Sequence, residues 1–270
     1  MIQSSDPEFE NDDDSQEEII EVPENIIEAL PEDKSLVISE DVFPNSLLIV
    51  PLYDRPLFPK MLLPVIISDE NLEKFLLEEL KGSLRYVGLV YSYEPLGTGP
   101  KSDANIPDKL AQIGVVGRIV QASKHGNDPM HIIVQVLERF EILEIISEDP
   151  VYKANVEYLR DPGGEKSEDE LKAFSVSIIN QIKELVQLNP LFKEELGLLM
   201  GRINLKDPAT LADFAASMTT ASGKELQEIL ETKSIKKRIE KALNLLRHEL
   251  EVAKLQVKIS QRVEDRMSQQ

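Results

Sequence analysis

The hydrophobic pattern of this chain changes its period partway along the sequence. Between residues 47 and 158, short apolar or alternating runs are separated by turns that contain proline or glycine, which is typical of β-strands. From about residue 167 onward, apolar residues recur every three or four positions, which is typical of α-helices. The sequence therefore predicts an α+β protein, in which a small, partly closed β-barrel with one inserted helix precedes an α-helical bundle.

The change of period divides the chain into four expected segments. The sequence DPGG at residues 161–164 marks the clearest boundary, because proline and glycine end strands and favour turns. The expected segments are an acidic arm (1–43), a β-barrel subdomain (44–161), a helical bundle (167–233) and a long C-terminal helix (234–270). The expected strands are residues 47–50, 62–67, 86–93, 113–122, 131–146 and 152–159.

Negative charge is concentrated in the arm. The formal net charge is −19, and residues 1–42 hold 15 acidic residues and one lysine, which leaves −5 for the other 228 residues. Residues 8–24 are expected to be disordered, because like charges repel one another and bury no apolar surface. The arm is interpreted as a solubilising extension or as a docking tail with a short recognition segment, for which four isoleucines are candidates: Ile19, Ile20, Ile26 and Ile27.

Composition excludes several classes of protein. The chain has no cysteine, which excludes disulfides, zinc–thiolate sites and cysteine nucleophiles. The acidic N-terminus resembles neither a secretory signal nor a transit peptide, and no run of about 18 apolar residues is present. We therefore expect a soluble, cytoplasmic protein.

Helix-start signals recur along the sequence. Ser68 or Asp69 can cap a helix over residues 70–81, and Asp207 can cap a helix that begins at the proline after it. Ser222 begins the S-x-x-E pattern of a capping box. Two further apolar stripes predict helices over residues 167–188 and 192–203.

Residues 51–64 form a proline-rich loop with large apolar side chains. Its prolines remove backbone donors, so this segment cannot be a central strand. The sequence leaves two interpretations of Leu57, Phe58 and Met61 open. Either Phe58 plugs one end of the barrel, or the three side chains form an exposed apolar patch that binds unfolded chains. On the second interpretation these three residues are the candidate substrate-binding site.

The C-terminal segment is predicted to form one long helix. Residues 234–267 contain no proline or glycine, and at about 1.5 Å per residue this helix would extend roughly 50 Å. We expect its apolar seam to pack partly on the bundle and partly on a second copy, which makes it the candidate self-association surface. The seam alternates at spacings of four and three, as in a coiled coil, and consists of Ile239, Leu243, Leu246, Leu250, Ala253 and Val257.

A basic run at the start of this helix raises the possibility of nucleic-acid binding. Residues 234–270 contain nine basic and five acidic residues. A solvated helix face is favoured over a nucleic-acid contact, because the folded body is slightly acidic and few aromatic residues are available for stacking. The basic residues in question are Lys236, Lys237, Arg238 and Lys241.

No reactive centre is recognisable in the sequence. Gly223-Lys224 lacks both the earlier glycine and the following Ser or Thr of a phosphate-binding loop. His125 and His131 flank the expected hairpin turn, with too few ligands nearby to indicate a metal site. No Gly-x-Ser-x-Gly nucleophile elbow is present. We expect no catalytic residue, no metal and no cofactor in this segment.

Several motifs resemble the N-terminal domain of Lon proteases. The sequence VPLYDRPLFPKMLLPV at residues 50–65 is similar to the opening strand and proline loop of that domain. Residues 113–119 resemble its glycine-bearing middle strand, and residues 138–142 its arginine-containing strand, although Val136 stands where the family often has glycine. Motifs similar to its helical half are residues 189–191, 211–214 and 226–231. The resemblance extends from about residue 44 to residue 270.

The resemblance implies both a fold and a function. It implies a PUA-like barrel and a helical bundle, then a helix leading to an ATPase module and a Ser-Lys protease domain that the 270 residues do not include. In the family, this region helps to select unfolded or damaged protein substrates and supports assembly of a homohexamer, while ATP and Mg bind elsewhere. The resemblance therefore implies the substrate-recognition and assembly region of an ATP-dependent serine protease.

Three other interpretations remain open from the sequence alone. The chain could be a stand-alone adaptor of the same fold, with no protease attached. It could be a coiled-coil scaffold whose long helix is the main functional element, or a nucleic-acid binder that uses the basic run. Each differs from the first interpretation in the partner that it requires.

Overall fold

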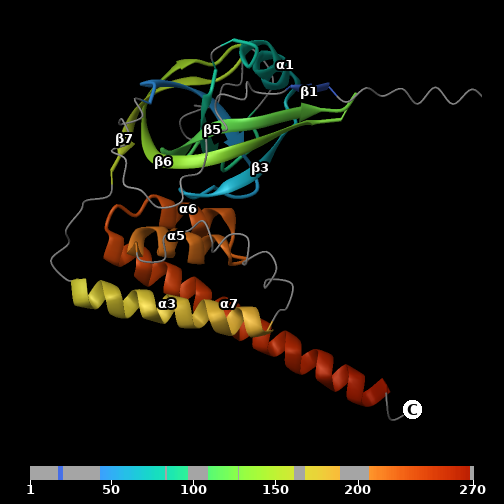
Figure 1. The fold of residues 1–270 in the computed structure, drawn as a ribbon, viewed down its shortest axis with the longest axis vertical. Coiled ribbons are helices and arrows are strands. Elements are labelled where there is room, and N and C mark those ends of the chain that lie inside the picture. The colour runs from blue at the N-terminus through green and yellow to red at the C-terminus, as the bar shows by residue number, and fades with distance from the viewer. Residues whose placement is uncertain are drawn as a thin grey trace, which may run out of the picture.

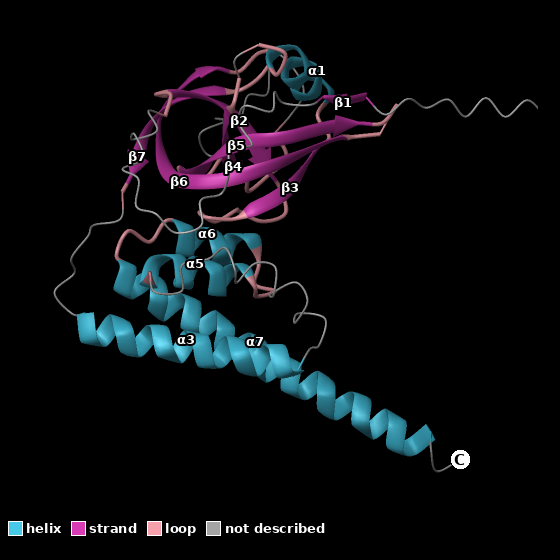
Figure 2. Ribbon diagram, viewed as in Figure 1, coloured by secondary structure: helices cyan, strands magenta, loops and turns pink. Residues whose placement is uncertain are grey.

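The structure, a computed structural model, describes residues 18–20, 43–82, 84–96, 109–126, 128–160, 168–188 and 207–267. Seven strands and five helices lie within these residues. Figure 1 and Figure 2 show the strands together in one half of the molecule, with α3, α5, α6 and α7 on one side of them and α1 on another. The strands are β1 Glu18–Ile20, β2 Ser46–Leu52, β3 Leu62–Ile67, β4 Tyr86–Tyr91, β5 Ile113–Lys124, β6 Met130–Ser147 and β7 Lys153–Leu159.

One sheet contains all seven described strands, in the order β1-β5-β4-β2-β7-β6-β3. β5 pairs additionally with β6, so that β5, β4, β2, β7 and β6 form a cycle in which each strand pairs with two others. The β2–β4 pairing is parallel and the remaining pairings are antiparallel. β3 and the helix α1 Glu70–Glu79 form the crossover between β2 and β4.

The apolar run of β2 is buried on both faces of the sheet. Successive side chains of a strand point to opposite faces, and here they enter two separate apolar clusters. Leu48 and Val50 belong to the cluster that continues into the helical half, while Leu47 and Ile49 belong to a second cluster around Phe140. This double burial explains why the sequence of β2 is continuously apolar rather than alternating.

β5 and β6 form a long hairpin that extends beyond the cycle of paired strands. They are 12 and 18 residues long, and register shifts along both strands allow them to bend. β3 pairs with the outer part of β6, from Leu62 opposite Gln135 to Ile67 opposite Met130. The predicted turn after Lys124 is confirmed, since β5 ends there and β6 begins at Met130.

The short strand β1 lies within the acidic arm and corrects one expectation. Residues 8–24 were expected to be disordered, but Glu18–Ile20 pairs with the outer end of β5. The backbone hydrogen bonds to β5 hold these three residues in a strand, although their like-charged segment forms no core of its own. Ile19 and Ile20 of the expected recognition segment are therefore part of the sheet, while Ile26, Ile27 and most of residues 1–42 lie outside the described residues.

The predicted helix caps are confirmed by hydrogen bonds. The Asp69 carboxylate accepts from the backbone of α1, and Asp207 accepts from Ala209 and Thr210 at the start of α5. Ser222 and Glu225 form the predicted capping box of α6. The helices of the second half are α3 Glu168–Leu188, α5 Pro208–Ser217, α6 Gly223–Leu230 and α7 Ile235–Met267. The expected helix at residues 192–203 lies outside the described residues.

One cluster of buried apolar side chains continues from the sheet into the helices. It includes Val50 and Phe58 from the strand half together with Phe214, Leu226 and Leu246 from the helical half. The two halves thus share a core although their sequence periods differ. The α+β class is confirmed, whereas the four expected segment boundaries stay a prediction.

Candidate functional site

Two of the large apolar side chains of the proline-rich loop, Phe58 and Met61, are buried in the interior of the protein. Phe58 is 1% exposed and Met61 is 7% exposed, and both belong to the cluster that joins the sheet to the helices. Leu57 is half-buried and packs against the same cluster. The interpretation of these residues as an exposed patch is therefore wrong for Phe58 and Met61. The burial of Phe58 agrees with the alternative, in which this side chain plugs one end of the barrel, while its place at a barrel end stays a prediction.

Backbone contacts with β6 fix the end of this loop. The Lys60 N–H donates to the carbonyl of Val136 at 2.9 Å, and the Val136 N–H donates to the carbonyl of Met61 at 2.8 Å. Lys60 has a φ of 65°, a left-handed conformation that is uncommon for residues other than glycine. Its ammonium also contacts Glu138 at 2.9 Å. These contacts hold Lys60 in its turn and place Met61 in the core.

The loop also contacts the helical half closely, at the connection between α5 and α6. Arg55 donates to the carbonyls of Ser217 and Thr219 at 3.0 and 3.3 Å. Gly223, the first residue of α6, lies so close that an added Cβ would come within 2.5 Å of the Asp54 carbonyl oxygen and 2.7 Å of the Tyr91 ring. A side chain at residue 223 would therefore separate the loop from α6, which gives this glycine a packing role.

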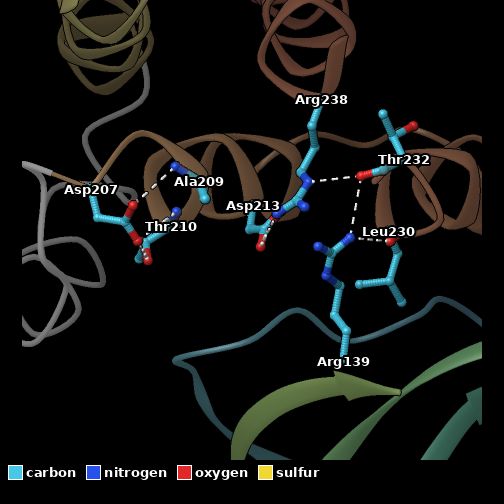
Figure 3. Close-up of polar contacts among 8 residues, drawn as sticks. All are labelled: Arg139, Asp207, Ala209, Thr210, Asp213, Leu230, Thr232 and Arg238. Carbon is cyan, nitrogen blue, oxygen red and sulfur yellow. Dashed lines mark hydrogen bonds and ion pairs between the residues drawn. The ribbon is translucent and has the colours of Figure 1, made fainter. Parts of the chain in front are cut away.

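A buried polar cluster joins β6 to α5 and α7, as Figure 3 shows. Arg139 of β6 donates to the carbonyls of Leu230 and Thr232 at 3.0 and 3.2 Å. The Thr232 carbonyl also accepts from Nε of Arg238 at 3.1 Å, so one oxygen connects the two arginines. Arg238 is fully buried, and its guanidinium lies 3.4 Å from the carboxylate of Asp213. This cluster fixes the helices against the sheet, because a buried charge is stable only with partners.

The predicted self-association seam of α7 is mostly occupied within the chain. Four of its residues, from Ile239 to Leu250, are at most 7% exposed and pack in the common core. Ala253 and Val257 are half-buried. For the four buried residues the assignment to a second copy is wrong, because α3 and α5 cover the face that the periodicity left open. Self-association by any other surface stays a prediction.

The opposite face of α7 carries an apolar stripe that the seam did not include. Figure 1 shows α7 continuing beyond α3 towards the C-terminus. Along this part, apolar side chains recur at every fourth position and are 51–74% exposed: Leu255, Ile259, Val263 and Met267. The sequence conceals this stripe because both faces of the helix carry apolar residues, and the heptad spacing is found on the face that folding buries.

A second exposed apolar strip lies on β3, which begins within the last residues of the proline-rich segment. Leu62 and Ile66 are 37% and 58% exposed, and Pro64 between them is also exposed. These residues are two positions apart, so they share one face of the strand. Ile133 is opposite Pro64 on β6 and is half-buried. An alternating pattern in the sequence of β3 would have revealed this strip, but Leu63 and Val65 are also apolar and conceal the alternation.

The basic run of α7 does not form one continuous charged face. Arg238 points into the buried cluster of Figure 3, and Lys236 pairs with Glu170 of α3 at 2.7 Å. The Lys241 ammonium approaches the carbonyl of Glu228 at 3.4 Å. A nucleic-acid contact would need these cations to face the same phosphates. Because they do not, the exposed basic residues are better interpreted as a solvated helix face than as a nucleic-acid contact.

The resolved pKa shifts have causes in packing and capping. Burial raises the pKa of Tyr158 to about 12, and its hydroxyl donates to the carbonyl of Pro44 at 2.7 Å. Burial is also the main cause of the raised pKa of Tyr93. Hydrogen bonds from Ser222 lower the pKa of Glu225 within the capping box. These shifts are therefore structural in origin and do not identify an acid–base pair.

The described residues contain neither a metal-binding cluster nor a helix that could cross a membrane. Within them, no group of three or more His, Cys, Asp and Glu side chains is arranged to hold a metal ion. None of the helices there combines the length and the apolar character that crossing a bilayer requires.

Comparison with curated proteins finds relatives along nearly the whole chain. Lon protease 1 of Syntrophotalea carbinolica is 38% identical over 271 residues, which cover 95% of this chain and 32% of that protein. Lon protease of Chlamydia pneumoniae is 37% identical over 241 residues, which cover 89% of this chain and 29% of that protein. The chain thus spans about a third of the length of the curated relatives that it matches.

A solved structure and a family model agree with these relatives. The N-terminal domain of Mycobacterium avium complex Lon protease superposes with a TM-score of 0.57 and 17% identity, over 74% of this chain and 97% of that chain, which is a likeness of fold. The family model described as the ATP-dependent protease La (LON) substrate-binding domain matches residues 46–248. The chain therefore belongs to the family of Lon substrate-binding domains.

Proposed function

We propose that this chain is the substrate-recognition region of an ATP-dependent Lon-type serine protease and binds unfolded or damaged proteins. The match of the substrate-binding family model over residues 46–248 carries this proposal. Full-length relatives named Lon protease support it, since this chain corresponds to about a third of their length. In such a protein, ATP and Mg would act in modules outside these residues, and six copies would assemble into a ring.

The β3 strip is the proposed contact for substrates. An unfolded protein differs from a folded one in the apolar side chains that it exposes, so a receptor needs an accessible apolar surface. Leu62, Pro64 and Ile66 provide one on a strand whose other side packs on the core through Val65 and Ile67. A rigid strand adds little ordering cost to binding. Of the loop residues proposed from the sequence, Leu57 remains a candidate contact because it is half-buried.

The fold can be specified further as a proposal. The cyclic pairing of β5, β4, β2, β7 and β6 supports a small barrel, and we propose that this barrel is PUA-like. An experimental structure of the chain would test both statements through the hydrogen bonds between β5 and β6. A cytoplasmic location stays a prediction.

The β3 strip can be tested with two serine substitutions. Leu62→Ser combined with Ile66→Ser is expected to weaken binding of reduced, carboxymethylated α-lactalbumin by about tenfold or more, because two exposed apolar contacts are removed. Fluorescence anisotropy of the labelled probe measures the affinity. The fold should be retained, since both side chains are already exposed.

The matched control is Val176→Ser on α3, where the side chain is 57% exposed. It removes similar apolar area from a helix in the other half and should leave the affinity unchanged. Equal affinity of the β3 double variant and the unaltered chain would remove β3 from the proposal. Absence of probe binding to the unaltered chain would argue against substrate recognition itself.

A further inference from the structure

The outer end of β5 is an edge of the sheet that a short strand of the same chain covers. β4 pairs with β5 through Arg118, and β1 pairs with it at residues 122–124, so both occupy the same side of β5. The other side of β5 pairs with β6 along its whole length. Figure 1 shows β1 beside this hairpin, close to α1. Without β1, the backbone groups at this end of β5 would lack a neighbouring strand on that side.

Other edges in the described sheet are less suited to accept a strand. Each of the five strands of the cycle already has two partner strands within it. β3, at the end of the strand order, contains Pro64, which has no N–H to donate. Residues 122–124 contain no proline, and their backbone already forms an antiparallel ladder with β1. If β1 leaves, the unpaired backbone groups of this edge become a template for another extended chain.

The strand that covers this edge is short. β1 has three residues, and a pairing of this length is marginal without further packing. Its sequence is Glu18-Ile19-Ile20, preceded and followed by glutamate. Glu18 is in register with Lys124, whose ammonium contacts Glu73 of α1, and Ile20 is in register with the buried Ala122. The sequence that pairs with this edge therefore consists of two adjacent isoleucines with glutamate neighbours.

We propose that residues 122–124 form a docking edge for an extended polypeptide segment, and that residues 18–20 of the arm occupy this edge until such a segment replaces them. The preferred segment has adjacent apolar β-branched residues with an acidic neighbour. Main-chain hydrogen bonds supply the affinity, as in strand addition generally. This inference rests on the proposed function and adds two statements to it. The unfolded segment binds in an extended conformation, and the arm competes with that segment for the same edge.

Removal of the arm is the direct test. A chain that begins at residue 43 is expected to bind reduced, carboxymethylated α-lactalbumin about tenfold more tightly than the full chain, which corresponds to losing one or two competing hydrogen bonds. Hydrogen exchange should show amides of residues 122–124 protected in the full chain, exposed after removal of the arm, and protected again when the probe is added. In the full chain, Ile19→Pro with Ile20→Pro should reproduce the effect without shortening the protein.

A peptide of residues 15–24 provides the specificity control. It should displace the probe from the shortened chain, whereas the same peptide with N-methyl groups at Ile19 and Ile20 should not, because N-methylation removes donors and keeps the charge. Equal displacement by both peptides, or no change in affinity after removal of the arm, would overturn the docking edge. If probe binding then depended only on Leu62 and Ile66, the proposed function would remain intact. If neither the full chain nor the shortened chain bound the probe, both proposals would be wrong.

Discussion

Phe58 and Met61 show that residue type and neighbouring prolines do not decide exposure. The prolines of the loop exclude regular pairing, and this leaves both a surface patch and a buried plug possible. Helices more than 150 residues further along the chain decide between them, because Arg55 beside these residues donates to Ser217 and Thr219. Phe58 and Met61 are consequently part of the core, and Arg55 is part of the contact between the two halves.

Phe58→Ala should destabilise the protein by about 3–5 kcal/mol, because it leaves a cavity in a fully packed region. Urea unfolding followed by circular dichroism gives the free energy of unfolding. Leu62→Ala, four residues further along at an exposed position, is the control and should cost clearly less. A Phe58→Ala protein as stable as the unaltered chain would show that the loop lies at the surface.

Asp213→Ala should be among the most destabilising single changes in the helical half. Arg238 and Asp213 are 0% and 3% exposed, and removing the carboxylate leaves the guanidinium buried without the adjacent negative charge. A loss of about 3–5 kcal/mol in the free energy of unfolding is expected. Glu184→Ala, which breaks the half-exposed pair with Lys254, should cost less than about 1 kcal/mol. Similar costs for both variants would contradict the role of burial.

At the scale of elements, α7 has two apolar faces with different roles. The face of Leu246 and Leu250 is buried against α3 and α5, and the face of Leu255 and Ile259 is exposed. A period of 3.6 residues allows both stripes on one helix, since positions four apart drift slowly around the axis. Only the packing of the other helices distinguishes the structural stripe from the free one.

Leu246→Ala and Leu255→Ala therefore form a matched pair on one helix. The first should lower the free energy of unfolding by about 2–5 kcal/mol through a buried cavity. The second should change it by less than about 0.5 kcal/mol, because the side chain is 57% exposed. Chemical denaturation of the two variants under identical conditions measures the difference. If both variants lost equal stability, the described packing of α7 would be wrong.

At the scale of the molecule, the sheet and the helices should unfold as one unit. They share an apolar cluster, and Arg139 of β6 donates to the carbonyl of the last residue of α6 and to a carbonyl just beyond it. The chain offers two separate probes of this behaviour. All six tyrosines lie between residues 53 and 158 and no tryptophan is present, so tyrosine fluorescence reports on the strand half, whereas ellipticity at 222 nm reports mainly on the helices.

Unfolding in urea should give coincident transitions by these two signals. Arg139→Met should lower both midpoints together, with a loss of about 1–3 kcal/mol, because charged hydrogen bonds at the junction are removed. Lys233→Ala, which removes a more exposed contact with Glu141, serves as the control and should have a smaller effect. Separate transitions in the unaltered chain would show that the two halves are independent.

The sequence by itself determined the local elements of this protein. Strand and helix periods, the caps at Asp69, Asp207 and Ser222, and the hairpin turn after Lys124 depend on neighbouring residues. Within the described residues these features are present, and the expected helix at residues 192–203 lies outside them. The motifs that resemble Lon N-terminal domains likewise led to the family that the comparisons confirm. Local hydrogen bonding and side-chain alternation are encoded within a few residues, which is why they can be read directly.

Only the tertiary structure decided which apolar surfaces are free. The sequence left open whether Phe58 and Met61 are buried or exposed, and how much of the α7 seam packs on the bundle or on a second copy. Most of these side chains are buried, whereas Leu62, Ile66 and the C-terminal stripe of α7 are exposed. The pairing of Glu18–Ile20 with β5 across about a hundred residues also had no local signal. A side chain is buried only when other parts of the protein pack against it, and here those parts are distant in the sequence.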